Sequence, residues 1–315
     1  MGIGRRLRAV RGIYVGEIME LSPCSVSSTL ADQLPEDQLE HRATPLERPA
    51  FLRYWFTMRN RLFPVLILLM ALSARSEIVS KPIVYQQGDT VLEGLSVYDD
   101  AKAGKRPAVL VVHQWKGLGD YEKKRAGMLA SLGYNVFAAD IYGKGIRPQT
   151  PQAAGAEAGK YKKDRDLLRA RVRAALTVLK SHELTAPGRI AAIGYCFGGT
   201  TVLELARSGA EVAGVVSFHG GLSSPTPDDA RNMKARVLAL HGADDPNVPP
   251  AEVSAFQEEM RKGGVDWQLI AYGGAVHSFT DFKAGNDNSK GAAYNERADR
   301  RSWEAMKQFF AELFK

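Results

Sequence analysis

The stretch Ile190-Ala-Ala-Ile-Gly-Tyr-Cys-Phe-Gly-Gly-Thr200 joins a short apolar run to a glycine-flanked cysteine and the beginning of a helical pattern. The apolar run predicts a buried strand and residues 200–206 a helix, so Cys196 would lie on the sharp turn between them. Gly194 and Gly198 would allow the tight backbone, and the helix N-terminus would direct free N–H groups at developing charge. This pattern indicates a nucleophile elbow and therefore an enzyme. The alternative is that Cys196 is only a small core residue.

Two later strands are each followed by a loop that contains a candidate partner for the cysteine. The strand at 235–241 runs into a turn with Asp244 and Asp245, and the strand at 267–272 precedes a loop with His277. Loops at the carboxyl ends of parallel strands share one edge of the sheet, where ligand sites of open α/β folds form. We choose Asp245, although spacing alone does not separate it from Asp244, and it could also be a simple turn former.

The order nucleophile, acid, histidine along the chain is that of the α/β-hydrolases. His241 is the strongest competitor of His277, because it closes its strand one loop before Asp245, but a histidine at a strand end is more often packed than free to move protons. His277 could itself be a loop histidine without a chemical role. The other histidines fit less well, being at an early strand end, in polar stretches or after a strand without an elbow: His113, His41, His182 and His219.

These residues resemble the dienelactone hydrolases (carboxymethylenebutenolidases), a family of the α/β-hydrolase superfamily. The resemblance extends from about Val91 to Phe314 and rests on five segments: Gly-Tyr-Cys-Phe-Gly-Gly at 194–199, Asp245 followed by Val248-Pro249, Gly274-Ala-Val-His-Ser-Phe279, Ala139-Asp-Ile-Tyr142, and the closing segment 295–303. The resemblance implies an α/β-hydrolase fold, with a mostly parallel central sheet and helices on both faces. It also implies that Cys196, Asp245 and His277 are the catalytic triad.

In such a triad His277 would take or share the thiol proton while Asp245 orients the imidazole. Attack on an ester or lactone carbonyl would give an oxyanion, for which we expect the backbone N–H groups of Phe197 and Trp115 as donors. Collapse would leave a thioester on Cys196, which water activated by the histidine would hydrolyse. Two further side chains are expected to support the site, Gln114 and Tyr142. The sequence assigns no substrate-binding residue, and we expect neither a metal nor a cofactor.

The chain departs from the family pattern at two positions near the expected site. Family members usually have a glutamate where this chain has Gln114, and an amide cannot accept the thiol proton. Lactone hydrolases with a carboxylate-bearing substrate have an arginine just beyond the histidine, where this chain has Asp281. An acid there should repel a carboxylate, so we expect dienelactone itself to be a poor substrate.

Alternating apolar runs and helical patterns indicate one α/β domain over residues 77–315. Helical patterns cover five ranges: 120–132, 163–182, 199–208, 250–262 and 296–314. The Ala/Gly/Pro/Gln-rich stretch 148–159 is expected to be a cap or a mobile loop over the site. Lys160, Lys162 and Lys163 could bring positive charge to the site, but a solvated basic helix start is the preferred interpretation.

Residues 58–76 have a basic start, a short apolar middle and small residues at the end, which is the layout of a secretory signal peptide. We expect translation to start at Met58, cleavage to fall between about Ser73 and Glu77, and residues 1–57 to be an incorrectly assigned extension or a disordered leader. Cleavage would also remove Cys24, so that the exported enzyme, periplasmic or secreted, would contain one cysteine. It would not remain stably inserted in the membrane. The alternative is an uncleaved membrane anchor at 62–74.

The net charge of +7 is spread along the 315 residues without an aromatic-interleaved basic block, which argues against nucleic-acid binding. We therefore expect a cysteine hydrolase that acts on small-molecule esters or lactones. One alternative is a thioesterase or peptidase with the same triad. Another, from a different class, is a degenerate hydrolase fold that binds a ligand or partner, although such a protein has no need of the complete triad. The sequence does not indicate the oligomeric state.

Overall fold

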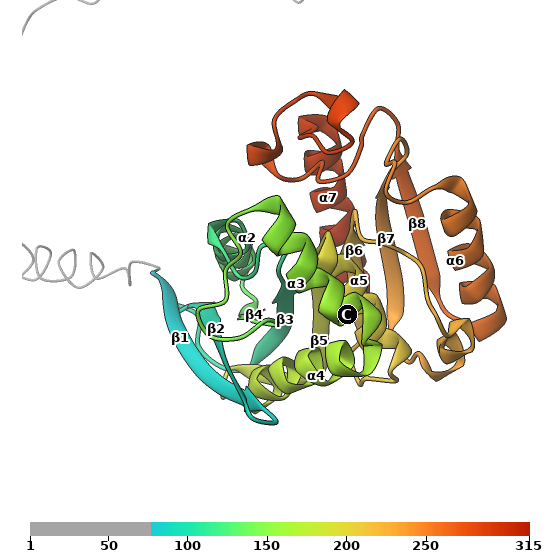
Figure 1. The fold of residues 1–315 in the computed structure, drawn as a ribbon. Coiled ribbons are helices and arrows are strands. Elements are labelled where there is room, and N and C mark those ends of the chain that lie inside the picture. The colour runs from blue at the N-terminus through green and yellow to red at the C-terminus, as the bar shows by residue number, and fades with distance from the viewer. Residues whose placement is uncertain (1–76) are drawn as a thin grey trace, which may run out of the picture. The chain divides into compact units, whose positions relative to one another are not determined.

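The computed structural model describes residues 77–315, which fold around one eight-stranded sheet (Figure 1). The expected leader at 1–57, the signal peptide at 58–76 and Cys24 lie outside the described residues. The strands follow the order β1-β2-β4-β3-β5-β6-β7-β8 across the sheet. Their bounds are β1 Ile78–Gln87, β2 Thr90–Asp99, β3 Arg106–Val112, β4 Asn135–Ala139, β5 Thr185–Tyr195, β6 Gly214–Phe218, β7 Arg236–Gly242 and β8 Trp267–Tyr272.

The strands β3 to β8 run parallel, and an antiparallel hairpin of β1 and β2 extends the sheet beyond β4. The central strands are apolar along their whole length because both faces are covered: residues 108–112 of β3 have no exposed surface. Parallel pairing aligns the carboxyl ends of β5, β7 and β8 at one edge of the sheet, and the loops that follow these strands carry the candidate residues. The mostly parallel α/β sheet expected from the sequence is confirmed.

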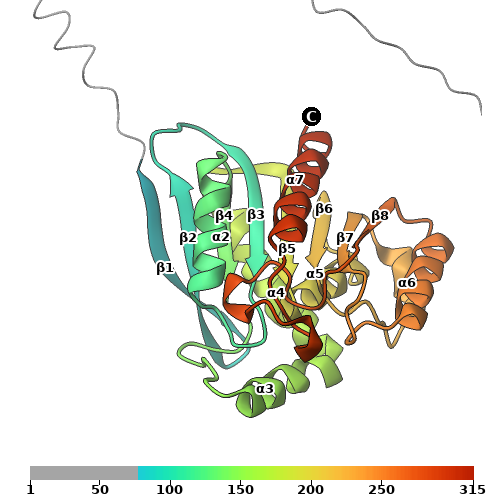
Figure 2. The same ribbon diagram turned by 90° about the horizontal axis from the view of Figure 1, so that it is seen from above.

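Helices cover both faces of the sheet (Figure 2). They are α2 Asp120–Ser131, α3 Pro151–Lys163, α4 Arg165–Ser181, α5 Phe197–Arg207, α6 Pro250–Gly263 and α7 Glu296–Leu313, with short 3₁₀ turns η1 Pro227–Asn232, η2 Phe282–Ala284 and η3 Asn288–Lys290. The apolar sides of α2 and α7 pack on one face, through residues such as Leu129 and Phe310. Those of α4, α5 and α6 pack on the other face, through residues such as Val172, Leu203 and Met260.

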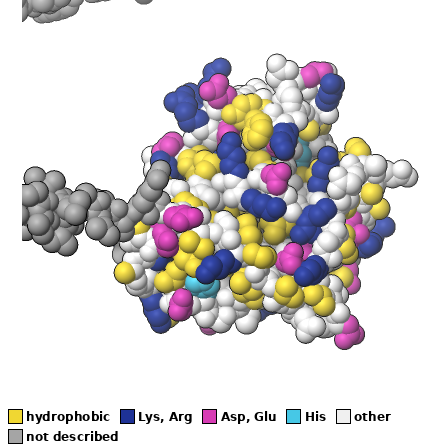
Figure 3. Space-filling view, turned by 90° about the vertical axis from the view of Figure 1, so that its left-hand side faces the viewer, with side chains coloured by type: hydrophobic (Ala, Val, Ile, Leu, Met, Phe, Trp, Pro, Cys, Tyr) yellow, Lys and Arg dark blue, Asp and Glu magenta, His cyan; other side chains and the backbone are white. Residues whose placement is uncertain are grey.

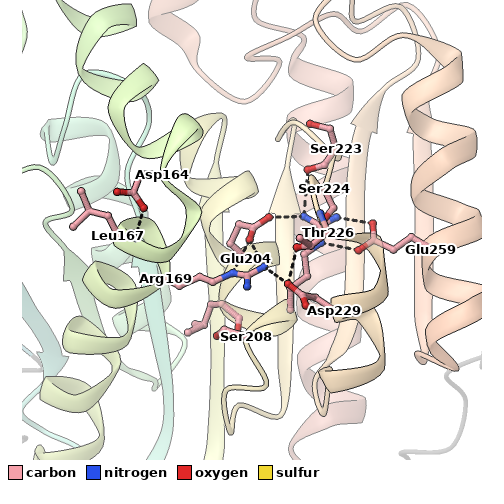
Figure 4. A network of polar contacts seen from close by, with 12 residues as sticks. Asp164, Leu167, Arg169, Glu204, Ser208, Ser223, Ser224, Thr226, Asp229 and Glu259 are labelled. Carbon is pink, nitrogen blue, oxygen red and sulfur yellow. Dashed lines mark hydrogen bonds and ion pairs between the residues drawn. The ribbon is translucent and has the colours of Figure 1, made fainter.

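A buried ionic network joins α4, α5, η1 and α6 (Figure 4). Arg207 at the end of α5 has no exposed surface and forms two parallel hydrogen bonds of 2.8 Å to the carboxylate of Glu259. It also donates to Glu204 at 3.0 Å, whose other oxygen accepts from Arg169. Arg169 in turn pairs with Asp229 at 2.7 Å. Three carboxylates and two guanidinium groups thus compensate one another; Arg207, Glu204 and Glu259 are buried, whereas Arg169 and Asp229 are partly exposed.

The segment expected to be a cap or mobile loop at 148–159 is largely helical, because α3 covers Pro151–Lys163. Thr150 caps the helix through its hydroxyl, which accepts the Ala153 N–H at 3.2 Å, and a proline stands at the first helical position, where its missing N–H costs nothing. The three lysines therefore end α3 rather than begin the next helix. The following helix, α4, starts at Arg165 with Asp164 as its cap.

The side of the molecule next to β1 mixes hydrophobic and charged side chains without one dominant apolar patch (Figure 3). Among residues 77–315, no helix combines the length and the apolar character needed to cross a bilayer.

Candidate active site

The turn between β5 and α5 consists of the single residue Cys196. Its backbone angles, φ 54° and ψ −114°, lie in the region that glycine alone adopts without strain. A Cβ atom at Gly194 would lie 2.0 Å from the carbonyl oxygen of Gly198, and one at Gly198 would lie 2.3 Å from the carbonyl oxygen of Val112. Both positions therefore require glycine, and the strand, turn and helix have the geometry of the elbow that the sequence predicts.

The side chains of Cys196, His277 and Asp245 form a hydrogen-bonded row. The Nε2 atom of His277 lies 3.0 Å from the sulfur of Cys196, and its Nδ1 atom lies 2.8 Å from Oδ2 of Asp245. The Asp245 side chain is fully buried, and its other oxygen accepts the backbone N–H of Asn247 at 2.8 Å. The loops after β5, β7 and β8 thus bring together the three residues expected to act as a triad.

The electrostatics favour a thiolate beside an imidazolium. Burial alone would raise the pKa of the Cys196 thiol, but the charge of His277 and its hydrogen bond lower it, with a smaller contribution from Lys162. Burial would lower the pKa of His277, yet the Cys196 thiolate and the hydrogen bond to Asp245 raise it to about 10. These opposite shifts favour the proton on the imidazole, and the two groups titrate as a pair.

The geometry separates the candidates that spacing left open. The carboxylate of Asp244 accepts the backbone N–H of Gly274 at 2.9 Å, so it supports the loop that carries His277 rather than the imidazole itself. Burial lowers the pKa of His241, and its Nδ1 atom has no hydrogen-bond partner among the described residues. The residue in contact with the sulfur is His277.

The two expected oxyanion donors lie on the loops after β5 and β3. The N–H of Phe197 is directed at the Cys196 sulfur and contributes to lowering its pKa. The carbonyl of Trp115 accepts the hydroxyl of Tyr142 at 3.0 Å, which fixes the orientation of this peptide. Within residues 77–315 the N–H of Trp115 has no acceptor, whereas the neighbouring N–H of Gln114 is held by Glu122 at 3.0 Å.

Aromatic rings line the same region. The ring of Tyr142 stacks on Tyr161 of α3, with 5.4 Å between ring centroids, and contacts Phe197 at 5.3 Å. The hydroxyl of Tyr161 donates to the carbonyl of Tyr142 at 3.1 Å. The buried imidazole of His113 stacks against Phe197 at 5.7 Å. The expected support role of Tyr142 thus corresponds to a ring that links α3 to the elbow.

The two departures from the family pattern contact each other. The side-chain amide of Gln114 donates to Oδ2 of Asp281 at 3.1 Å. Beneath them lies Glu122, almost fully buried, whose carboxylate accepts the backbone N–H groups of Gln114 and Gly119. Burial raises the pKa of Glu122, although these two hydrogen bonds oppose the shift and Asp281 adds to it.

The three lysines at the end of α3 differ in their surroundings. Lys160 pairs with Glu157 at 2.6 Å on the surface. Lys162 is exposed, but its charge reaches the site, because it lowers the pKa of Cys196. The predicted solvated character agrees with the exposure of Lys162 and Lys163, although they stand at a helix end rather than a helix start.

Three polar residues around the site had no role assigned from the sequence: Glu122, Thr280 and His219, which was considered only as a weaker candidate for the triad histidine. Glu122 lies three residues after the cap residue Gly119 and accepts its backbone N–H at 2.9 Å, but a glycine at the cap position gives only half of the capping-box pattern in the sequence. The imidazole of His219 contacts the hydroxyl of Thr280 at 2.7 Å, and the two residues are 61 positions apart in the sequence. No local sequence pattern predicts such a contact. Among residues 77–315, no group of three or more His, Cys, Asp and Glu side chains is arranged to hold a metal ion.

Comparisons with known proteins agree with this arrangement. Residues 93–314 match the Dienelactone hydrolase family. A solved structure named m3DLH is 41% identical, with 76% of this chain and 99% of its own chain covered and a TM-score of 0.73. The crystal structure of P91, a dienelactone hydrolase-like promiscuous phosphotriesterase from metagenomic libraries, is 40% identical with the same coverage and a TM-score of 0.72. A protein of Aquifex aeolicus named "Putative carboxymethylenebutenolidase" is 28% identical over 213 residues, 66% of this chain and 89% of its own.

Proposed function

Since the chain belongs to the dienelactone hydrolase family and is a carboxylic-ester or lactone hydrolase, we propose that it acts through a Cys196 thioester formed by a Cys-His-Asp triad. The observation that carries this proposal is the contact of 3.0 Å between the Cys196 sulfur and Nε2 of His277. A sulfur that only filled the core would not require an imidazole oriented by a buried carboxylate.

Acylation begins when the Cys196 thiolate attacks the carbonyl carbon of the ester or lactone. The negative charge moves to the carbonyl oxygen, where the N–H groups of Phe197 and Trp115 stabilise it. As the tetrahedral intermediate collapses, the carbon–oxygen bond breaks and Nε2–H of His277 protonates the departing alkoxide. The products of this half-reaction are an alcohol, a thioester on Cys196 and a neutral imidazole, which Asp245 holds in position.

Deacylation uses the neutral imidazole as a base. His277 removes a proton from water as the oxygen attacks the thioester carbon, and the same N–H groups stabilise the second oxyanion. Collapse breaks the carbon–sulfur bond and releases the carboxylic acid. The thiolate and the imidazolium are thereby restored, so protons balance over the cycle.

The test compares hydrolysis of a neutral 4-nitrophenyl ester by the full chain with that by its Cys196→Ala and His277→Ala variants. We expect Cys196→Ala to lower kcat to background, and mass spectrometry of the quenched native enzyme to find the acyl group on Cys196. An unchanged rate in Cys196→Ala would refute the proposal. An acylated thiol that does not turn over would favour a binding protein, and preferential cleavage of thioesters or peptides would favour a thioesterase or a peptidase with the same triad.

The natural substrate is proposed to be a neutral ester or lactone. Gln114 and Asp281 stand where carboxylate-binding relatives are expected to carry a glutamate and an arginine, and the amide of Gln114 orients the Asp281 carboxylate through a contact of 3.1 Å. A carboxylate-bearing substrate would bring a second negative charge close to Asp281, whose charge would repel it.

This specificity is tested with dienelactone and with a neutral lactone of similar size. We expect native kcat/KM to be much lower for dienelactone, and Asp281→Asn to raise it about tenfold for dienelactone alone. Asp281→Asn is the matched change because it removes the charge and keeps the shape. Comparable turnover of both lactones by the native enzyme would contradict the proposal.

A second candidate activity is hydrolysis of neutral phosphotriesters, favoured by the 40% identity to the promiscuous phosphotriesterase P91. The thiolate would attack phosphorus, the aryloxide would leave, and water would then cleave the sulfur–phosphorus bond. Release of 4-nitrophenolate from diethyl 4-nitrophenyl phosphate that is lost in Cys196→Ala would support this activity. Equal release by both proteins would exclude it.

A further inference from the structure

A second histidine, His219, lies directly beneath the proposed nucleophile. It follows β6, has no exposed surface, and adopts a positive φ of 39°. Its ring meets the ring of His277 edge to face, with 5.4 Å between centroids, and Phe279 packs against it at 5.1 Å. The positive φ is unusual for a residue with a Cβ atom, so the surrounding structure must hold this imidazole in place.

The hydrogen bonds of His219 determine which ring nitrogen carries the proton. The backbone N–H of Cys196 is shared between the carbonyl of Phe218, at 3.0 Å, and Nδ1 of His219, at 3.1 Å. Because an N–H can only donate, Nδ1 must be unprotonated. The proton of the neutral ring is therefore on Nε2, which donates to the hydroxyl of Thr280 at 2.7 Å.

Thr280 is itself fixed by two side chains of α2. Its hydroxyl lies 2.6 Å from the hydroxyl of Tyr121 on α2, and its carbonyl accepts a hydrogen bond of 2.9 Å from Arg125. Arg125 also pairs with Asp299 of α7. Thr280 follows His277 by three residues in the same loop, so the position of that loop is tied to the body of the domain.

The ring of His219 is neutral in these surroundings. Burial, and then the charge of His277, hold its pKa well below the usual range, and the charge of Arg125 acts in the same direction. The other titratable residues around it are Cys196, whose backbone N–H it accepts, Tyr195, whose ring centroid lies 6.1 Å away, and Tyr121, which contacts Thr280. His219 therefore carries no positive charge that would repel the imidazolium of His277.

We infer that His219 is a positioning residue that keeps the loop of Cys196 and the loop of His277 in register, by accepting from the Cys196 N–H and donating to Thr280. This inference rests on the proposed thiol mechanism. Cys196 is held on a strained turn, and the 3.0 Å contact with His277 depends on where that turn lies relative to the next loop. Misplacement of reacting groups by about 1 Å can cost roughly 100-fold in rate, so loss of the bridge should appear in the chemical step.

The test uses three variants of the full chain that remove the bridge in different ways. His219→Phe keeps a ring and removes both hydrogen bonds. His219→Asn tolerates the positive φ and can still accept the Cys196 N–H, but it is too short to reach Thr280. Thr280→Val removes the hydroxyl and keeps the shape. His182→Asn, at the C-terminal end of α4, is the control.

We expect His219→Phe to lower kcat roughly 10- to 100-fold with little change in KM. His219→Asn and Thr280→Val should each lose less, and the control should match the native enzyme. The rate of Cys196 alkylation by iodoacetamide, followed on the Cys196 peptide by mass spectrometry, should show its acid limb at higher pH in His219→Phe. A purely structural role would lower the melting temperature and leave both the kcat of the folded fraction and the alkylation profile unchanged.

A double-mutant cycle tests whether His219 and Thr280 act through the same bridge. If both residues act through one bridge, His219→Phe/Thr280→Val should be no slower than His219→Phe alone, whereas independent effects would multiply. Multiplying effects, or native kcat and a native alkylation profile in folded His219→Phe, would overturn the inference. If His219→Phe does not fold, Thr280→Val and His219→Asn take its place. A native kcat and a native alkylation profile in both of these variants would equally overturn the inference. Alkylation needs no substrate, so these outcomes remain distinct from a failure of the proposed hydrolysis, in which the native enzyme itself would be inactive.

Discussion

Cys196 and His277 share one proton, and the two pKa shifts favour its position on the imidazole. The thiol pKa is lowered and the imidazole pKa is raised to about 10, each mainly against the effect of burial. In the proposed mechanism the thiolate needs no further base to activate it, so the chain can carry Gln114 where the family is expected to have a glutamate. The proposal therefore has His277 act first as an acid and only afterwards as a base.

The pH dependence of kcat/KM for a neutral ester should follow from these shifts. The rate should fall as pH drops through the lowered pKa of Cys196, because the thiolate is protonated. It should also fall as pH rises through about 10, because His277 can no longer protonate the leaving alkoxide. The check is a profile from pH 4 to 11; a single rise near pH 6.5 with no alkaline decline would mean that a neutral histidine acts as base on a thiol.

Much of the residue-level site was predictable, because parallel strands place their carboxyl-end loops together. Pattern and chain order were enough to propose Cys196 and His277. Asp245 was also chosen from the sequence, but spacing did not separate it from Asp244, and side-chain directions do. The pairing of Gln114 with Asp281 spans 167 residues, and each position looked like an isolated departure from the family. Spacing carries no information on contacts of that kind.

At the level of secondary structure, five expected helices match α2, α4, α5, α6 and α7 within a few residues; α4, α6 and α7 have an apolar stripe of helical period, and α5 is buried on all sides. α3 escaped detection since its buried face consists of the small residues Ala154 and Ala158 and of Tyr161. Two glycines, Gly155 and Gly159, also lower its helical propensity. The β1–β2 hairpin was not predicted either.

Replacing Gly159 should stabilise the domain. It lies inside α3, and a Cβ atom there meets nothing within 4 Å, so Gly159→Ala should raise the free energy of unfolding by roughly 0.5–1 kcal/mol. Gly145→Ala is the matched comparison, because its Cβ is equally free while its φ of 80° disfavours alanine. Urea unfolding should show opposite signs for the two changes; equal effects would contradict the helical assignment of α3.

The buried network of Figure 4 predicts a large effect from one surface-inaccessible cation. Arg207→Met should leave Glu259 buried without its partner and lower the free energy of unfolding by about 3–5 kcal/mol. The exposed pair of Arg261 and Glu258, at 3.4 Å, is the control, and Arg261→Met should cost less than about 1 kcal/mol. Urea unfolding at pH 7 measures both, and similar losses would show that the network contributes no more than a surface pair.

For the molecule as a whole, buried neutral histidines predict instability in acid. Burial lowers the pKa of His113 to about 4. Below about pH 6.5 this imidazole therefore binds a proton in the unfolded chain but stays neutral in the folded chain. Stability should therefore fall by about 2 kcal/mol between pH 6.5 and 5 from His113 alone. The raised pKa of His277 acts in the opposite sense, but it changes stability only above about pH 6.5. Urea unfolding at both pH values should show a smaller difference in His113→Gln than in the native protein; the same slope would refute the assignment.

We also propose that the mature enzyme is exported. The signal-peptide pattern at 58–76 predicts that protein isolated from its native cell begins near Glu77. N-terminal sequencing decides this, and a mature chain that starts near Met1 would contradict it. A chain that starts at Met58 and remains with the membrane fraction would instead indicate the uncleaved anchor.

The hairpin that extends the sheet also determines how neighbouring molecules can meet. Without it, the outermost strand would be β4, which is buried along its whole length and strongly apolar. The strand that occupies the edge instead is β1, where Lys81 and Pro82 are both exposed. A proline offers no amide proton to a further strand, and docking there would strip water from the lysine ammonium. Strand addition between copies of this protein at the β1 edge is therefore disfavoured, which reduces the tendency of this edge to aggregate.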